Sequence, residues 1–276
     1  MPELPEVETI RRRLQNGSSE NSSLIGDTIR DVQIFWDRSI ATPLPDEFRR
    51  RIQGQQIRNI SRRGKYMLFH LSEDVLLIHL RMSGDLVIRA AGQELAPHDR
   101  VVFDFESGER LAFNDTRKFG RVWLVNDPEN IIGPLGPEPL SSHLTAEVLH
   151  KRLHDHARQL KPLLLDQTFL AGLGNIYADE ALHLAHLHPL RRSDTLSMEE
   201  SRRLWRSIRQ VLGEGIRRSG ASIDWVYRGG DFQNFFRAYG RTGEPCPECG
   251  TPIVRIVVGQ RSTHYCPVCQ PPPGTR

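Results

Sequence analysis

The sequence of 276 residues has only four cysteines, and all of them lie from Cys246 onward. Small secreted domains use many cysteines as disulfides, so this scarcity argues against that class, and the clustering of the four favours a metal over disulfides. Long apolar runs are also missing, since none approaches the roughly 18 residues that a membrane helix needs. The start, Met-Pro-Glu-Leu-Pro-Glu, lacks the basic and apolar regions of a signal peptide. We therefore expect a cytoplasmic protein that makes no contact with a membrane.

A strong excess of charge of either sign is absent as well. Lysine and arginine number 37 and aspartate and glutamate 34, which gives a net charge of +3. This small excess is compatible with a nucleic-acid partner but does not identify one. Hydrophobic residues make up 38% of the chain, enough for a core. The length fits two domains or one large domain.

The region up to about residue 130 has the pattern of an antiparallel β-sandwich or barrel. Short segments that alternate apolar and polar residues, or that are continuously apolar, follow one another between turn signals. The predicted strands lie at 28–36, 56–60, 66–70, 75–80, 86–88, 101–105, 111–113 and 122–125. One helix precedes them, because Val7, Ile10 and Leu14 recur at helical spacing.

The second half of the chain has a helical pattern. Residues 130–139 are dense in proline and glycine, which indicates a linker. Beyond it, apolar residues at spacings of three and four predict helices at 145–154, 157–166, 175–184 and 197–219. The turn at 170–175 contains two glycines, and Asn175 is placed to cap the following helix. This segment is therefore predicted to be a helix, a glycine turn and a helix.

The strongest chemical signal is a pair of C-x2-C knuckles. Cys246 and Cys249 are separated by sixteen residues from Cys266 and Cys269. Each knuckle can place two thiolates on a tetrahedral ion, so the spacing predicts one Zn²⁺ with four cysteine ligands. Four thiolates leave no open position on the metal, so this zinc would be structural. A redox dithiol pair, or four unrelated thiols, is the alternative.

Residues 253–265, between the knuckles, predict a β-hairpin that turns at Gly259 and Gln260. The hairpin and its approach are basic, so they could follow DNA phosphates, although a solvated surface is an equal alternative. The basic residues are Arg237, Arg241, Arg255 and Arg261. Three nearby histidines could suggest another metal site, but solvated or core histidines at a helix end explain them more simply. These are His183, His186 and His188.

The first residues could carry covalent chemistry. A small residue such as Pro2 permits removal of Met1, which would leave a secondary amine with a pKa of about 8. Attack of that amine on a sugar aldehyde carbon yields an iminium ion, which is an electron sink for eliminations. Glu3 could act as a general acid, and Glu6 could position the amine. The alternative is that a proline and acidic residues simply start a helix. Considered on its own, this segment favours that alternative.

Two further basic segments have open interpretations. Lys65 follows two arginines at the mouth of a predicted strand, which suits a phosphate contact or a surface charge cluster. Arg117 and Phe119 lie on a predicted turn, where such a pair could enter a base stack. An aromatic residue that caps a strand is the alternative.

Six ordered motifs give these pieces a common interpretation. They are PELPEVE at 2–8, RGK at 63–65, HLRMSG at 79–84, GPEPL at 136–140, GLGNIYA at 172–178 and YGRTGEPC at 239–246. In these motifs the sequence closely resembles bacterial formamidopyrimidine-DNA glycosylases, in the helix-two-turn-helix superfamily with endonuclease VIII. The likeness runs from residue 2 to residue 269, and it makes the nucleophilic Pro2 the leading hypothesis.

The resemblance implies an α+β multidomain protein. An N-terminal antiparallel β-sandwich with flanking helices would occupy residues 1–132, a helix-two-turn-helix domain residues 133–239, and a zinc ribbon with a tail residues 240–276. It also implies a monomeric glycosylase and AP lyase of base excision repair that acts on damaged double-stranded DNA. Oxidised purines, namely 8-oxoguanine and ring-opened formamidopyrimidines, would be excised, and the strand would be cut by β,δ-elimination.

The resemblance also implies roles for particular residues. Pro2 would attack C1′, Glu3 would protonate the ring oxygen of the deoxyribose, and Glu6 would support Pro2. Lys65 would contact a phosphate beside the lesion. Three residues would fill the gap left by the flipped base, with Arg117 facing the orphaned cytosine: Met82, Arg117 and Phe119. Four more would contact DNA, the first two at the phosphates that flank the damage: Asn175, Arg261, His98 and Lys161.

Some positions depart from the family pattern. The loop at 221–236 lacks the usual glycine turns, which leaves the preference among oxidised purines open. Arg81 and Thr116 replace the glycine and proline that are common beside the residues that would fill the gap, called the wedge residues below (Met82, Arg117 and Phe119).

Two rival functions remain. One is an endonuclease VIII-like enzyme for oxidised pyrimidines, which Glu-Leu rather than Glu-Gly after Pro2 disfavours. The other is a catalytically silent zinc-ribbon DNA-binding protein, which predicts loss of Pro2, Glu3 or Lys65.

Overall fold

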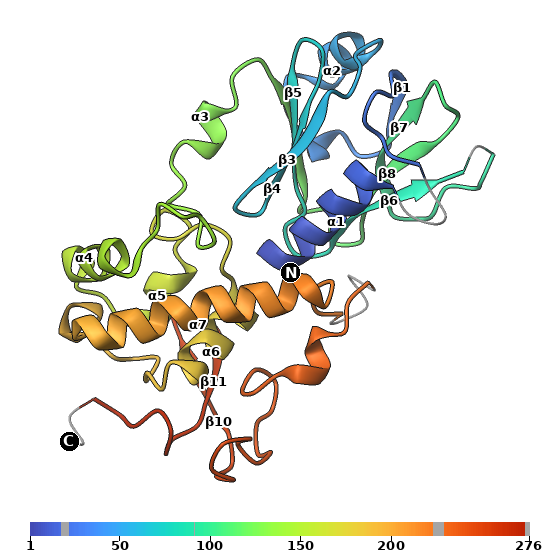
Figure 1. Cartoon of the computed structure of the whole chain (residues 1–276). Helices are drawn as coiled ribbons and strands as arrows, with labels where there is room; N and C mark the ends of the chain where they lie inside the picture. The colour runs from blue at the N-terminus through green and yellow to red at the C-terminus, as the bar shows by residue number, and fades with distance from the viewer. Residues whose placement is uncertain (18–21, 91, 223–228, 274–276) are drawn as a thin grey trace. The chain divides into compact units, whose positions relative to one another are not determined.

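The chain forms two compact units in a computed structural model that describes residues 1–17, 22–90, 92–222 and 229–273 (Figure 1). The first unit combines Met1–Pro134 with Ser222–Gly229, and the second combines Leu135–Ala221 with Gly230–Arg276. Part of the atypical loop noted above, residues 223–228, lies outside the described residues. Within the described ranges, no helix has the length and apolar character needed to cross a membrane.

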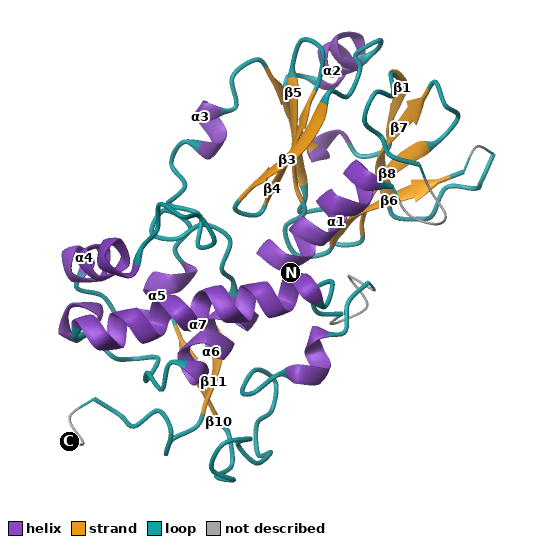
Figure 2. Cartoon of the chain, in the orientation of Figure 1, coloured by secondary structure: helices purple, strands orange, loops and turns teal. Residues whose placement is uncertain are grey.

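The first unit is built on two β-sheets (Figure 2). One sheet has the order β1-β7-β8-β6 and the other the order β2-β9-β5-β4-β3, and the pairing is antiparallel except between β2 and β9. The strands are β1 (Ile29–Ile34), β2 (Ile40–Thr42), β3 (Asn59–Arg63), β4 (Tyr66–His70), β5 (Val75–His79), β6 (Gly84–Arg89), β7 (Asp99–Phe105), β8 (Arg110–Asp115) and β9 (Arg121–Val125). The helical elements are α1 (Leu4–Asn16), η1 (Asp37–Ser39), α2 (Pro45–Ile52) and α3 (Glu129–Ile132).

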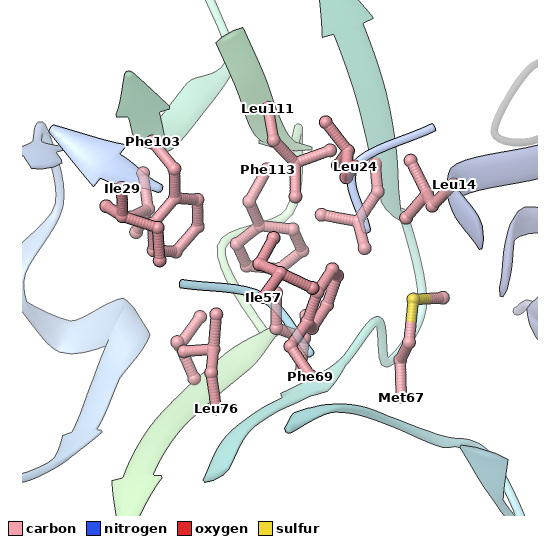
Figure 3. Close-up of a cluster of buried hydrophobic side chains, with 14 of the residues drawn as sticks. Leu14, Leu24, Ile29, Ile57, Met67, Phe69, Leu76, Phe103, Leu111 and Phe113 are labelled. Carbon is pink, nitrogen blue, oxygen red and sulfur yellow. The ribbon is translucent and has the colours of Figure 1, made fainter. Parts of the chain in front are cut away.

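Both sheets and α1 contribute to a single apolar core. Leu14 of α1, Phe69 of β4, Phe103 of β7 and Phe113 of β8 belong to the same buried cluster (Figure 3). Alternate residues of β6 are buried, as expected for a strand with one face on a core. Burial of each such large side chain contributes roughly 1.5–3 kcal/mol. The cluster confirms the predicted sandwich with flanking helices.

Four short elements of this unit were not predicted, and one strand is displaced. They are η1, β2, α2 and α3, of which α3 overlaps the start of the predicted linker. Helix α2 has only Phe48 and Ile52 as buried residues, too few to produce a periodic signal. Strand β2 is three residues long and pairs in parallel with β9. The strand predicted at 56–60 was wrong at its start, because Ile57 is buried but β3 begins only at Asn59. Gln56 instead forms an isolated antiparallel bridge with Thr28, and the backbone nitrogen of Ile57 donates to the oxygen of Asp27 at 2.9 Å, so this stretch pairs outside β3.

The second unit contains the predicted helices and the hairpin. Its elements are α4 (Ala146–His156), α5 (Leu160–Leu165), α6 (Asn175–Leu184), η2 (Ser193–Thr195), α7 (Met198–Arg217), η3 (Phe232–Phe235), β10 (Val254–Val258) and β11 (Arg261–Tyr265). Ser197 caps α7, accepting a hydrogen bond from the backbone nitrogen of Glu200. Helices α6 and α7 pack closely at Gly215, where a Cβ atom would lie 2.5 Å from the ring of Tyr177.

The start of α6 corrects one prediction. Helix α5, a glycine turn and α6 follow one another as expected, but the residue before the helix is Gly174 and Asn175 is the first helical residue. Asn175 is therefore not the cap. Its side chain donates a hydrogen bond to the hairpin instead, as described below.

Candidate active site and DNA-contacting residues

Pro2 and Glu3 lie immediately before α1, and both are buried. The Oε2 atom of Glu6 accepts a hydrogen bond from the backbone nitrogen of Glu3 at 2.8 Å. Glu6 therefore fixes the backbone directly after the proline, which is a physical basis for its predicted supporting role. Both carboxyl groups lie at the positive end of the helix dipole, where negative charge is favoured.

Met1 controls the chemistry available at Pro2. While Met1 is present, the nitrogen of Pro2 is part of an amide and cannot act as a nucleophile. The side chain of Met1 is 40% exposed, whereas the residues from Pro2 to Val7 are buried. Removal of Met1 would therefore expose a secondary amine on a backbone that the rest of the segment holds in place.

Lys65 lies in the two-residue turn between β3 and β4, after Gly64 with a φ of 56°. Its side chain is only 5% exposed. Helix α1 packs against β3, and the Nε atom of Arg62 lies 3.4 Å from Oε2 of Glu8 in that helix. The turn that carries Lys65 is thus attached to the helix that follows Pro2.

His79, at the end of β5, is held neutral. Burial lowers its pKa to about 3, and the charges of Arg81 and Lys65 act in the same direction. The backbone nitrogen of Arg81 donates to Nδ1 of His79 at 3.0 Å, so Nδ1 is the unprotonated ring nitrogen. The ring of Tyr66 packs edge-on against this imidazole at 4.6 Å between centroids. His79 therefore fixes the turn before Met82 without carrying charge.

The predicted wedge residues lie on two turns of the first unit. Met82 is half-buried in the turn between β5 and β6. Arg117 and Phe119 are exposed in the turn between β8 and β9, and the guanidinium carbon of Arg117 lies 5.1 Å from the ring centroid of Phe119. An exposed aromatic ring covered by a cation is suited to contact a base stack. His98, also exposed, lies directly before β7, with Nδ1 3.1 Å from the guanidinium of Arg100.

In the second unit, the structure brings Asn175 next to the hairpin. The Nδ2 atom of Asn175 donates to the backbone oxygen of Ser262 at 3.0 Å. Ser262 follows Arg261, which is exposed at the first position of β11. Gly259 and Gln260 have φ values of 55° and 62°, as a type I′ turn requires. The two residues predicted to grip phosphates are therefore fixed relative to each other by one hydrogen bond.

Lys161 is placed differently from an exposed DNA contact. Its side chain is completely buried, and Nζ lies 2.5 Å from Oδ1 of Asp179 and 2.9 Å from the backbone oxygen of Asn175. The other oxygen of Asp179 accepts from the backbone nitrogen of His264 in β11 at 3.0 Å. In this arrangement Lys161 holds Asn175 and the hairpin from within. Direct contact of Lys161 with DNA stays a prediction.

The four cysteines form a structural zinc site. Their sulfur atoms all lie within 4.8 Å of one another, with Cys246 and Cys269 at 3.9 Å and Cys249 and Cys266 at 3.4 Å. A tetrahedral zinc with Zn–S bonds of about 2.3 Å requires sulfur separations of about 3.8 Å. The donor set is four thiols with no disulfide, which fits Zn²⁺ and confirms the predicted site with four cysteine ligands.

Two residues near this site have roles that the sequence did not indicate, since His183 was interpreted as a solvated or core histidine and Glu180 was not singled out. His183 is buried, and its Nε2 atom lies 3.3 Å from the sulfur of Cys246, where an N–H donor supports a metal-bound thiolate. Glu180 is fully buried and accepts from the backbone nitrogens of three consecutive residues at 2.8–2.9 Å. These are Arg237, Ala238 and Tyr239, the segment that leads into the ribbon. Burial raises the pKa of Glu180, while these hydrogen bonds lower it.

The basic surface of the hairpin is smaller than its arginine content suggested. Arg237 lies 3.4 Å from Glu214, and Arg241 lies 2.9 Å from Glu244. Arg255 donates to the hydroxyl of Ser262 at 3.1 Å. Arg261 remains exposed at the tip. The interpretation as a phosphate contact therefore concentrates on Arg261.

Comparison with known families matches each part of this architecture. The sequence model of the formamidopyrimidine-DNA glycosylase N-terminal domain matches residues 1–122, and that of the H2TH domain of the same glycosylases matches residues 135–226. The model of the zinc finger found in FPG and IleRS matches residues 243–272. The fold and its zinc site thus define a DNA glycosylase of the H2TH class.

Individual relatives are similar over the whole chain. A curated formamidopyrimidine-DNA glycosylase of Protochlamydia amoebophila is 45% identical over 279 residues, covering 98% of this chain and 99% of its own. Two solved structures superpose with a TM-score of 0.90 over 98% of this chain and 100% of theirs. They are MutM with carbocyclic 8-oxo-G containing DNA, at 34% identity, and Lactococcus lactis FPG with FAPY-dG containing DNA, at 35%. The chain belongs to the formamidopyrimidine-DNA glycosylase family.

Proposed function

We propose that this glycosylase excises oxidised purines from duplex DNA and then cleaves the strand through an iminium intermediate on Pro2. The observation that carries the proposal is the buried start of α1, where Glu6 fixes the backbone beside Pro2 and Glu3. The family relation supports it, because similar proteins have been solved with DNA containing 8-oxo-G or FAPY-dG. In this proposal the enzyme acts as a monomer.

The reaction uses the nitrogen of Pro2 after removal of Met1. Its lone pair attacks C1′, and the glycosidic bond breaks with its electrons leaving on the base, which takes up a proton. Glu3 protonates the ring oxygen, which opens the sugar to an iminium ion at C1′. Removal of a C2′ proton leaves its bonding electrons to this electron sink, and the C3′–O3′ bond breaks as the 3′ phosphate departs. Removal of the C4′ proton then breaks the C5′–O5′ bond as the 5′ phosphate departs, and water hydrolyses the iminium ion to free Pro2.

The remaining residues bind and distort the DNA. Lys65 and His98 contact the damaged region from the N-terminal domain at 1–132, together with Met82, Arg117 and Phe119, which fill the gap left by the flipped base. Asn175 from the domain at 133–239 and Arg261 from the ribbon at 240–276 hold the flanking phosphates. Kinking a duplex costs several kcal/mol, and the wedge and phosphate contacts offset that cost.

Excision assays with two lesions test the substrate class. Duplexes that contain 8-oxoguanine or thymine glycol, each labelled at one end, are incubated with the mature protein. We expect strand cleavage at 8-oxoguanine to exceed cleavage at thymine glycol. The reverse order would support the endonuclease VIII-like alternative, and no cleavage of either duplex would support a silent DNA-binding protein.

A further inference from the structure

Asp115, at the end of β8, is a buried carboxylate outside the chemistry described above. Its side chain is completely inaccessible to solvent. One oxygen, Oδ2, accepts from the backbone nitrogen of Gly120 at 2.8 Å. The other, Oδ1, accepts from the backbone nitrogen of Arg117 at 3.2 Å and from the hydroxyl of Ser83. A buried carboxylate is stable only with such donors, and all of these come from turns that carry predicted wedge residues.

The two oxygens hold both ends of one turn. Arg117 and Gly120 bracket the tip at 116–119, in which Lys118 has a φ of 60°. The side chains of Arg117 and Phe119 are exposed, so packing against the core does not fix their direction. The backbone of the tip, and through it the direction of both side chains, therefore depends on the carboxylate.

The same carboxylate reaches the second turn through Ser83. The hydroxyl of Ser83 donates to Asp115 and accepts from the backbone nitrogen of Arg117 at 3.0 Å, which joins the two turns directly. Ser83 immediately follows Met82. Gly84 and Gly120 also both lie against the ring of Phe113, where a Cβ atom would approach to 2.8 and 2.1 Å. The two turns thus converge on one buried ring, labelled in Figure 3.

The backbone of Asp115 also forms hydrogen bonds with His98 and Arg100, which lie at the start of β7. Its nitrogen donates to the backbone oxygen of His98 at 2.9 Å, and its oxygen accepts from Nε of Arg100 at 2.8 Å. We propose that Asp115, acting with Ser83, is a positioning residue that holds the wedge in the shape needed to enter duplex DNA. This inference rests on the proposed wedge role of Met82, Arg117 and Phe119.

If Asp115 orders the wedge in advance, the activity lost in an Asp115 variant should depend on the DNA substrate. A wedge that is already ordered does not have to be ordered when the base is extruded. Loss of this order therefore slows the reactions that need base flipping. A single strand with an abasic site has no base to extrude and no stack to enter. The two substrates therefore separate a defect of the wedge from a defect of the chemistry.

The test compares Asp115→Asn with Asp74→Asn. Asp74 is an equally suitable control because it is 5% exposed and accepts from Arg51, Gln55 and Asn126 at 2.6–2.8 Å, away from the wedge turns. For Asp115→Asn we expect kcat/KM on an 8-oxoguanine duplex to fall by up to about 100-fold, the loss that a misplacement of about 1 Å can cause. Borohydride trapping of a single-stranded abasic oligonucleotide should equal that of the wild type. The fluorescence rise of 2-aminopurine beside the lesion should be smaller than with the wild type, and Asp74→Asn should behave as the wild type.

Results other than these would contradict either the positioning role of Asp115 or the proposed function. Equal loss on both substrates, an equal loss in Asp74→Asn, or no loss in Asp115→Asn would overturn the positioning role. If the wild type neither excises the lesion nor forms the trapped adduct, the proposed function fails instead. Should Asp115→Asn not fold, Ser83→Ala decides, because it removes only the link between the turns. We expect it to slow excision from the duplex alone, and unchanged excision would overturn the inference.

Discussion

Two exposed arginines of this protein lie on tight turns that are held in place by different means. Arg117 belongs to a turn on the large sandwich, fixed by hydrogen bonds to the buried Asp115. Arg261 follows the hairpin turn of the ribbon, whose small cluster of buried residues includes two zinc ligands. A segment with few apolar residues cannot form a stable core, so a metal replaces it. Where a core already exists, a single carboxylate is enough to shape a turn.

Removal of one zinc ligand should have the largest effect, because it acts on the fold of the ribbon. In Cys266→Ser we expect loss of zinc and of measurable binding to abasic duplex DNA, since a structural zinc contributes about 10–16 kcal/mol of binding free energy. Metal analysis and DNA titration measure both quantities. Val268→Ser, at an exposed position of the same knuckle, is the control and should retain both. Full zinc content with wild-type affinity in Cys266→Ser would contradict the comparison.

Loss of the exposed arginine should have a smaller effect that leaves the ribbon intact. We expect Arg261→Ala to keep its zinc and melting temperature and to weaken binding similarly on all sequences. The slope of log K against log salt should fall by about 1, as for the loss of one phosphate contact. Arg255→Ala removes the same charge from the same hairpin and should change the slope less. Equal slopes for the two variants would show that only net charge matters at this tip.

The smallest effect concerns pH and the turn before Met82. In the unfolded chain His79 takes up a proton below its ordinary pKa of about 6.5, whereas in the fold its pKa is about 3. Its neutral form therefore favours the fold at neutral pH, and this contribution is lost as the pH falls from about 6.5 towards 3. In His79→Asn, stability should decline less over this range when melting is measured at several pH values. A decline as steep as that of the wild type would argue against a buried neutral His79.

Local patterns predicted much of this architecture. The bounds of β4 and α6 agree with the predicted 66–70 and 175–184, because a short apolar run marks β4 and the glycine turn marks the start of α6. The zinc ligands were predictable because each pair lies within one turn. Resemblance supplied Pro2 as nucleophile, which the acidic start of a helix could not distinguish from ordinary capping.

Residues that act over long distances in sequence were not predictable. Lys161 and Asp179 give no sign in the sequence that they form a completely buried pair. A glutamate in a helix, such as Glu180, is usually solvated. Glu180 instead accepts hydrogen bonds from a segment 57–59 residues away in the sequence. Asp115 joins Ser83 across 32 residues. Such roles depend on which segments the fold brings together, and local periodicity carries no information about that.

Borohydride trapping tests the central claim, covalent chemistry at Pro2, most directly. The mature protein is mixed with a duplex that contains an abasic site, reduced, digested and analysed by mass spectrometry. The account predicts a stable adduct on the peptide that begins at Pro2, and no adduct on protein that retains Met1. An adduct on a lysine peptide, or no adduct with protein that still cleaves the strand, would contradict it.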